Sequence, residues 1–457
     1  MNWQEYKPGS NEPWNLQRVW TLHRRFGFAA TWSELQRDLA DGWQKSIDRV
    51  VAGKSATFGV PENIEQMSKV IGGSAVSSNR NERLTAWWIY RMYLSPNPLR
   101  ERMAIMWHDH FATSNAKVKD LNLMHQQNQV FRQHGLGKFN SLLEKILKHG
   151  AMLKWLDGDE NRAGQINENL GRETLELFTL GAGNYTEDDV KNASRALTGW
   201  SVHQAGFRIR EDWHDADSKT ILGQSGNFSG DDLIEIACAH PATAKRIAWR
   251  LCSEFLCESL VTDENIDSLA AILSNSELNI SAAVETILRS QLFFSDANLK
   301  RQIIAPEPFV VGAVRALELF DPPASTMVLS DWIEQLGRKL FYPPNVGGWP
   351  GGRSWLNSRT TIARANFGVT LTQGRLNKTG SKPDLLKLAE QHIGNQNLPE
   401  VVEFYSQLLT GTTNEQLNRT LLEKARTAAK NSASNGDSDI AGLAVALILS
   451  SPAAQLS

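Results

Sequence analysis

The sequence predicts a mainly α fold: a large multi-helix domain with a small β-hairpin insert and a C-terminal helical subdomain. Three observations carry this prediction. Apolar residues recur at three- and four-residue spacing, most regularly in 139–156, as on the buried face of a helix. Residues that cap helices precede several such stretches, with Thr31 and Glu34 forming a capping-box pair. Strand-like alternation with a turn appears convincingly in one segment, 201–222.

Composition narrows the classes of function. The chain has 457 residues with 48 Lys+Arg against 50 Asp+Glu, a net charge of −2. A nearly neutral chain argues against electrostatically driven binding to nucleic acid or to an anionic membrane. No apolar run reaches the roughly 18 residues of a membrane span. Three cysteines at these spacings predict neither a disulfide framework nor a zinc site.

The N-terminal third reads as an arm followed by short helices. Residues 1–20 predict an arm anchored by tryptophans, and helical spacing begins at residue 21. The Gly/Ser-rich stretch 72–81 predicts a loop. An aromatic helix, 82–93, ends at the prolines of 95–98, and the next helix, 99–107, delivers His108 and His110. The first residues, 1–20, contain no apolar signal-peptide core, so the sequence as written predicts a cytoplasmic protein, or a periplasmic or exported one if a leader has been removed.

The rest of the chain continues as helices with two interruptions. Thr186 and Ser229 predict capped helix starts, each followed by acidic residues in the first turn. A proline- and glycine-rich loop, 343–355, predicts a rigid segment with an open backbone. Beyond residue 375 the polar stretches 378–382 and 431–439 predict looser connections. The predicted domains are an arm (1–20), a main helical domain (21–375) and a C-terminal helical subdomain (376–457).

The acidic stretch that ends at Gly181 is the first candidate site. On a helix, Asn169, Glu173 and Glu176 share one face, and Arg172 could bridge Glu168 and Glu176. Gly171 in the middle predicts that another element packs closely there. Two interpretations stay open: a salt-bridged surface helix, or a half-buried acidic site.

Two histidine motifs and one aromatic loop are further candidates. His108 and His110 would serve as metal ligands with additional partners, or would bond to nearby backbone. His214 and Asp215 stand near the predicted turn of the hairpin and would be either functional or solvated. In the 343–355 loop, Trp349 and Trp355 could stack on sugar rings or fill the core, and we expect Trp349 or Trp355 to line a concave site with Arg353 rather than lie in the core.

Four separated runs make the chain resemble a large bacterial family, catalogued as domain of unknown function 1800. They are NENLGRETLELFTLGAGNYTEDDV, WHDHFAT, GNFSGDDLIEIACAHPATAKRIA and YPPNVGGWPGGRSWLN, and the resemblance covers nearly the whole chain from about residue 23. It implies a mostly helical and often exported protein. It also implies genes that neighbour a second uncharacterised family, similar to alkaline phosphatases and sulfatases.

Two classes of function follow. The first is a hydrolase or metal-assisted enzyme acting on a polar polymer such as a polysaccharide. Its residues would be, for catalysis, Glu173, Glu176, His214 and Asp215; for substrate binding, Arg172, Trp349, Arg353 and Trp355; and for a divalent metal, His108 and His110. We expect Glu173 and Glu176 to share one pocket with His108 or His110 and with the His214–Asp215 pair. The alternative is a non-enzymatic binding or assembly partner of the phosphatase- or sulfatase-like protein.

Overall fold

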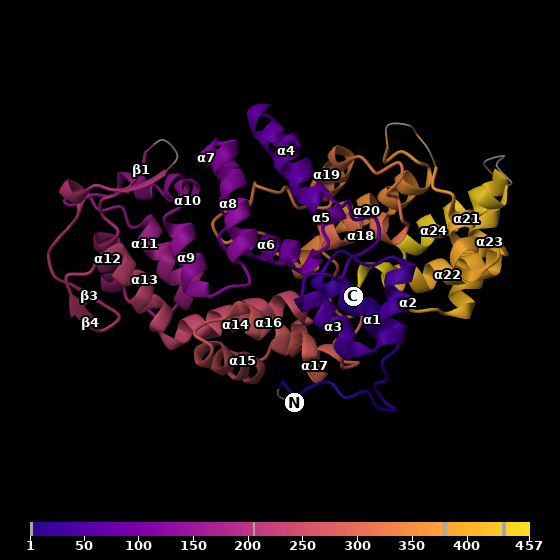
Figure 1. Ribbon diagram of the computed structural model, residues 1–457, viewed down its shortest axis with the longest axis horizontal. Coiled ribbons are helices and arrows are strands. Elements are labelled where there is room, and N and C mark those ends of the chain that lie inside the picture. The colour runs from indigo at the N-terminus through magenta and orange to yellow at the C-terminus, as the bar shows by residue number, and fades with distance from the viewer. Residues whose placement is uncertain (1–2, 204–205, 378–379, 381, 432–435) are drawn as a thin grey trace. The chain divides into compact units, whose positions relative to one another are not determined.

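The computed structural model describes residues 3–203, 206–377, 380, 382–431 and 436–457 (Figure 1). This part of the chain contains 24 helices, amounts to 64% helix and has two small antiparallel two-stranded sheets. The predicted mainly α fold is confirmed. Half of the residues in the predicted polar connections, namely 378–379, 381 and 432–435, lie outside the described residues. No helix in the described part combines the length and the apolar character that crossing a membrane requires.

The chain forms two compact units, each assembled from separated segments. Unit 1 comprises residues 1–4, 103–287 and 340–349, and unit 2 comprises residues 5–102, 288–339 and 350–457. This division does not follow the bounds predicted from the sequence, which stay a prediction. All the candidate site residues except Arg353 and Trp355 belong to unit 1.

Unit 1 is a set of helices around an apolar core. Its helices, the first and last of which continue into unit 2, are α6 (Pro98–His110), α7 (Asn115–Val118), α8 (Leu121–His134), α9 (Phe139–Leu147), α10 (Gly150–Trp155), α11 (Asn169–Glu173), α12 (Glu187–Ala196), α13 (Gly230–Ala239), α14 (Pro241–Phe255), α15 (Asp263–Asn275) and α16 (Ile280–Arg289). The stripe of α9 is fully buried, as its spacing predicts. The caps at Thr186 and Ser229 form complete capping boxes, which confirms both predicted helix starts.

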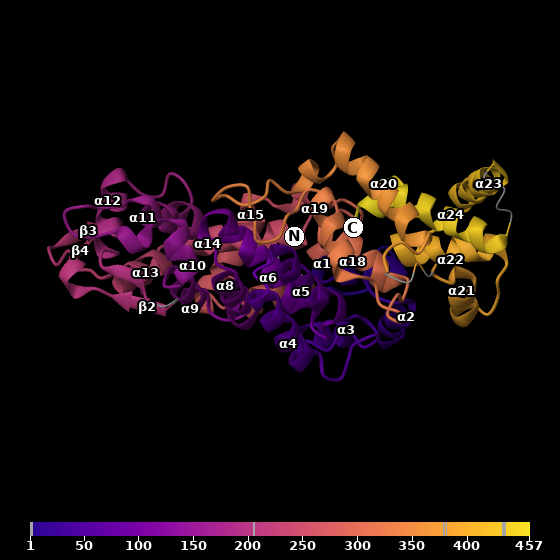
Figure 2. The same ribbon diagram turned by 90° about the horizontal axis from the view of Figure 1, so that it is seen from above.

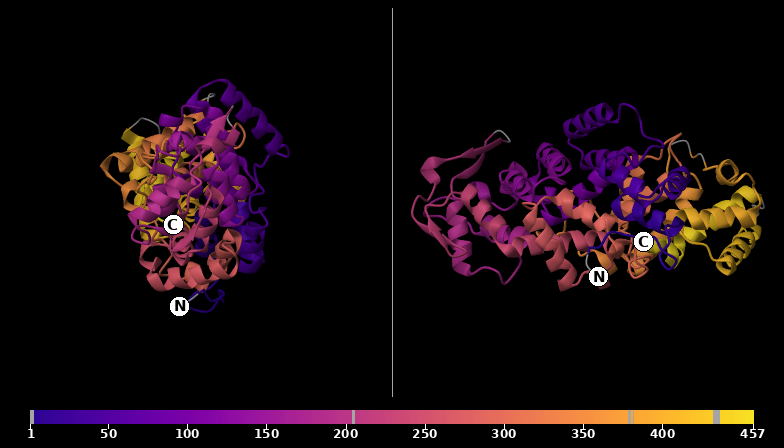
Figure 3. Two further views of the ribbon diagram at one scale, coloured as in Figure 1. Left: turned by 90° about the vertical axis from the view of Figure 1, so that its left-hand side faces the viewer. Right: turned by 60° about the horizontal axis from the view of Figure 1, so that its bottom comes forward.

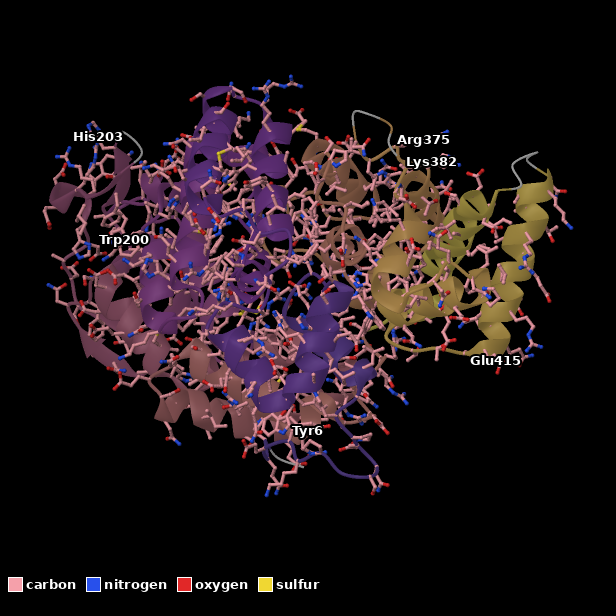
Figure 4. All side chains as sticks on the ribbon, turned by 45° about the vertical axis from the view of Figure 1, so that its right-hand side comes forward. Tyr6, Trp200, His203, Arg375, Lys382 and Glu415 are labelled. Atoms are coloured by element: carbon pink, nitrogen blue, oxygen red, sulfur yellow. The ribbon has the colours of Figure 1, made fainter. Side chains whose placement is uncertain are left out.

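The β insert differs from the predicted single hairpin. β1 (Trp200–His203) pairs with β2 (Gly206–Ile209), and β3 (Lys219–Ile221) pairs with β4 (Gln224–Gly226). The expectation that the turn before Lys219 closes one hairpin within 201–222 is therefore wrong, since β3 folds back on β4 beyond it. The reason is that Asp215 is bound to α12, so the chain between β2 and β3 is held against that helix. Figure 2 shows β3 and β4 beside α12 and α13, and β1 runs from the buried Trp200 to the exposed His203 (Figure 4).

Unit 2 contains the N-terminal and C-terminal helices. They are α1 (Leu16–Phe26), α2 (Trp32–Asp41), α3 (Trp43–Val51), α4 (Ile64–Ser77), α5 (Asn81–Leu94), α17 (Gln291–Phe294), α18 (Pro306–Ala316), α19 (Thr326–Gln335), α20 (Ser358–Thr372), α21 (Leu385–Ile393), α22 (Leu398–Thr410), α23 (Glu415–Asn431) and α24 (Asp437–Ser450). At the yellow end of the chain α24 packs against α20, α22 and α23 (Figure 3). The capping box of Thr31 and Glu34 is present.

One local prediction in unit 2 is wrong in part. The predicted loop 72–81 is confined to residues 78–80, because α4 runs through the glycines to Ser77 and α5 begins at Asn81. Small residues suit a helix that packs closely, and α4 lies against α5 with Gly72 and Ala75 buried. Trp20, predicted as an anchor of the arm, lies inside α1 and is 1% exposed.

Candidate functional site

The acidic helix begins as an α-helix and changes its pitch. α11 continues directly as a π-helix, Thr174–Leu180, which ends at Gly181 with φ +81°. The Thr174 hydroxyl donates to the Leu170 carbonyl at 2.6 Å, and the Thr179 hydroxyl donates to the Thr174 carbonyl at 2.5 Å. Such hydroxyl bonds compete with the regular backbone pattern of a helix. π-helical segments occur frequently at functional sites, which singles out this helix.

Gly171 fixes this helix against its neighbour. A Cβ at this position would overlap the hydroxyl and backbone of Ser194 in α12. The sequence-based expectation of a close contact at Gly171 is confirmed. Figure 2 shows α11 beside α12. Leu170, Leu175 and Phe178 face the core, so the opposite side of the helix is left for its charged residues.

Glu173 and Glu176 lie on that outer side and are half-buried. Burial, followed by the charge of Glu176, raises the pKa of Glu173 above its ordinary value of 4.5. Glu176 accepts a hydrogen bond from the Tyr185 hydroxyl. Burial and Glu176 raise the pKa of Tyr185 to about 12, so the phenol remains a donor at neutral pH. We call Glu173, Glu176 and Tyr185 the acidic face.

Arg172 stands beside this face with two carboxylate partners. Its guanidinium lies 3.1 Å from Glu168 and 2.7 Å from Glu187, at the start of α12. The predicted bridge to Glu168 is present, whereas Glu187 takes the place expected for Glu176. The pair with Arg172 lowers the pKa of Glu187 and raises that of the guanidinium.

The two histidines of α6 point to different partners. The Phe341 backbone N–H donates to His108 Nε2 at 3.2 Å, and His110 Nε2–H donates to the Phe178 carbonyl at 3.0 Å. The Phe178 carbonyl belongs to the π-helix, so His110 does reach the acidic helix, but through its backbone. Both histidines are buried, at 1% and 7% exposure.

Asp109, between them, joins three segments of unit 1. Its carboxylate pairs with Arg250 of α14 at 2.5 Å and accepts the Trp349 backbone N–H at 2.8 Å. Gly348 has φ +81°, and a Cβ there would lie 2.5 Å from Asp109 oxygens. Only glycine fits this approach, because both the conformation and the space exclude a side chain. We call His108, Asp109, His110, Arg250 and the Gly348–Trp349 segment the His-Asp-His node.

The surroundings of His110 keep its ring neutral. Trp107, Phe111, Phe139 and Phe178 have ring centroids within 6.3 Å of the imidazole. Burial, then the charges of Arg250 and Arg246, lower the pKa of His110 to about 3. Burial takes away the water that would solvate a protonated ring, and the two guanidinium charges repel it, which explains the direction of this shift.

The structure gives the predicted metal ligands no shared cluster. Among the described residues, no three His, Cys, Asp or Glu side chains gather where they could hold a metal ion. His108 uses Nε2 as an acceptor for backbone, and the aromatic rings surround His110. A metal at these histidines stays a prediction.

His214 and Asp215 secure the end of α12. His214 Nδ1 lies 3.0 Å from the Thr198 carbonyl oxygen. Asp215 accepts two hydrogen bonds from Arg195, at 2.7 and 3.0 Å, and this pairing holds its pKa below the usual range. Arg195 stands eight residues after Glu187, about 12 Å along α12 at 1.5 Å per residue. The hydrogen bonds and ion pairs of the described residues join neither His214 nor Asp215 to the acidic face, and the single shared pocket stays a prediction.

The aromatic loop turns inward rather than outward. Trp349 is 8% and Trp355 is 4% exposed, so the expectation that they lie outside the core is wrong. Trp349 packs near the His108 ring, with centroids 5.6 Å apart, in unit 1. Trp355 packs on Gly337 and under the Arg338 guanidinium in unit 2. Arg353 is exposed, and substrate binding by these three residues stays a prediction.

Sequence reasoning missed three residues that the structure brings to this region. Tyr185 was noticeable only as the aromatic residue before a helix cap. Arg246 and Arg250 stand four apart on α14, a spacing that places two like charges on one helical face. Two like charges on one helical face repel each other, and this repulsion could have predicted that Arg246 and Arg250 find partners outside α14.

A family model described as "Protein of unknown function (DUF1800)" matches residues 21–456. Neither a curated protein nor a solved structure matches the chain.

Proposed function

The chain belongs to the DUF1800 family of proteins of unknown function, and on that premise we propose that it is a hydrolase of a polar polymer such as a polysaccharide. The acidic face would supply its acid–base pair. One observation carries the proposal: two half-buried carboxylates lie on the outer side of the continuous helix formed by α11 and the π-helix, and the pKa of Glu173 is raised.

The two carboxylates suit different roles. Glu173 holds its proton to higher pH than an ordinary glutamate, as a general acid must. Glu176 accepts a hydrogen bond from Tyr185, which orients this carboxylate for the role of base or nucleophile. Glycoside hydrolysis requires such a pair, one carboxyl that donates a proton and one that stays ionised. Arg172 would bind polar groups of the substrate beside them.

The test is polymer cleavage by the purified full-length chain. New reducing ends would be measured with neutral and acidic polysaccharides, for wild type and for Glu173→Gln and Glu176→Gln. We expect each variant to lose about 100-fold or more in rate, the usual contribution of a general acid or base. Glu235→Gln is the matched control, since Glu235 is an exposed carboxylate of α13 in the same unit.

The outcomes separate the two classes of function. Cleavage that is lost in both glutamine variants and kept in the control supports the hydrolase. A panel with no cleavage, or variants that retain the wild-type rate, would overturn it. The non-enzymatic binding or assembly partner of a phosphatase- or sulfatase-like protein would then be favoured.

A further inference from the structure

We propose that a pocket beside Arg246 binds the carboxylate of an acidic sugar, so that the substrate of unit 1 is a uronate-bearing polysaccharide. The inference deepens the proposed function, and it rests on that function for the claim that the bound polymer is also cleaved.

The pocket lies between α14, α15 and the end of the π-helix. Its volume is about 380 Å³, within the roughly 300–1,000 Å³ of small-molecule sites. Its polar and aromatic lining residues are Asn184, Lys245, Arg246, Trp249, Asp263 and Asp267, the last of which is paired with Lys245, and Leu180 lines it at the end of the π-helix. We call this the Arg246 pocket.

α14 carries three cations, and Arg246 differs from the other two. Lys245 pairs with Asp267 at 2.8 Å, and Arg250 pairs with Asp109. Arg246 has no carboxylate within ion-pair distance among the described residues. Burial and the charge of Arg250 lower its pKa, so the guanidinium lies where a positive charge is unfavourable. A bound anion would supply the missing counter-charge.

The guanidinium is also held in a fixed orientation. Its Nε–H donates to the Leu177 carbonyl at 3.4 Å, and its carbon lies 4.6 Å from the centroid of the Trp249 ring. The two terminal amino groups form no hydrogen bond with the described residues, which leaves a donor fork for a ligand. A planar fork of this kind matches a carboxylate in bidentate geometry.

The other groups of the pocket favour a sugar acid over phosphate. Trp249 is 37% exposed, and its ring offers apolar surface beside polar groups. Asp263 and Asn184 can accept hydrogen bonds from hydroxyl groups. A second negative charge, as on phosphate, would be repelled by Asp263. A sugar acid carries one negative charge for Arg246 and hydroxyl groups for Asp263 and Asn184, and so it fits the pocket better than phosphate does.

The pocket and the acidic face are connected through one helix. Leu177, whose carbonyl accepts from Arg246, directly follows Glu176, and Leu180 lies four residues beyond Glu176 in the same π-helix. A sugar unit in the Arg246 pocket would therefore lie about one turn from the carboxylate pair.

Binding of sodium D-galacturonate to the full-length chain, measured by calorimetry, tests the inference. This monosaccharide has no glycosidic bond, so binding is read without cleavage. We expect its neutral methyl ester and inorganic phosphate to bind at least 10-fold more weakly. Arg246→Gln should weaken galacturonate binding at least 10-fold. Arg210→Gln, which removes another arginine stacked on a tryptophan in unit 1 (4.2 Å from Trp213), should leave it unchanged.

The possible results separate failure of the galacturonate site from failure of the proposed hydrolase. Equal binding of acid and ester, tighter binding of phosphate, or an Arg246→Gln variant that matches wild type would overturn the inference. If circular dichroism shows that Arg246→Gln does not fold, Trp249→Leu replaces it, with an expected loss of at least 5-fold. Galacturonate binding without polymer cleavage would leave this site standing and remove the hydrolase. Cleavage of neutral polymers by a chain that does not bind galacturonate would do the reverse.

Discussion

The His-Asp-His node and the acidic face lie in the same unit, and each is a cluster of titratable side chains. In the node, Asp109 has a cation and a backbone N–H as partners, and each histidine bonds to a backbone group. On the acidic face, Glu173 has no cation or hydrogen-bond donor among the described residues, and its pKa is raised. A cluster of titratable residues is therefore no indication of chemistry by itself. Whether its polar groups already have partners distinguishes a structural role from a reactive one.

The largest expected difference in stability between the node and the acidic face is at Asp109. Asp109→Ala would leave Arg250 and the Trp349 N–H without their partner in a buried setting. We expect the free energy of unfolding to fall by about 3–5 kcal/mol, the usual cost of breaking a buried ion pair. Urea denaturation measures it. Glu173→Gln is the control and should change stability by less than about 0.5 kcal/mol, as a partly exposed side chain without such partners does. Equal effects of the two variants would contradict the distinction.

A smaller effect on stability is expected in the 343–355 loop, at Gly348, which contacts Asp109. Gly348→Ala places a Cβ 2.5 Å from Asp109 oxygens, whereas Gly351 also has positive φ, +63°, with nothing within 4 Å of its Cβ. Both alanines carry the strain of a backbone with positive φ, about 1–3 kcal/mol. The overlap should add about 1–3 kcal/mol at Gly348 alone. Thermal or urea unfolding of the two variants measures this difference in the free energy of unfolding. Equal losses of stability would mean that Asp109 moves away from the new Cβ at little cost, which would contradict the prediction.

The smallest effect concerns pH. The pKa of His110 is about 3 in the folded chain against its ordinary 6.5, so folding disfavours the protonated ring. The stabilising contribution is complete above pH 6.5 and decreases as pH falls from 6.5 toward 3. Between pH 7.5 and 5.5, wild type should lose about 1.4 kcal/mol more than His110→Gln, which cannot titrate. If the free energy of unfolding changes equally with pH in the two proteins, the pKa of His110 is not lowered by folding.

The sequence by itself determined what depends on near neighbours along the chain. Helix starts at Thr31, Thr186 and Ser229 follow from side chains that cap backbone groups three residues away. The close contact at Gly171 was predictable because a glycine inside a helix is unfavourable without such a reason. The buried stripe of α9 follows from its periodicity. These interactions act within one or two helical turns, and the sequence displays them directly.

Only the tertiary structure decided which charges meet. Asp109 pairs with Arg250, 141 residues away, and Gly348 closes on the same carboxylate from a third segment. Arg172 pairs with Glu187, 15 residues away, rather than with Glu176, four residues away. Likewise, β3 pairs with β4 rather than with β2. Local spacing offers several partners at similar free energy, and the packing of distant helices selects among them. That Arg246 has no carboxylate partner among the described residues is likewise a property of the assembled unit, because only the fold determines which carboxylates lie within reach of its guanidinium.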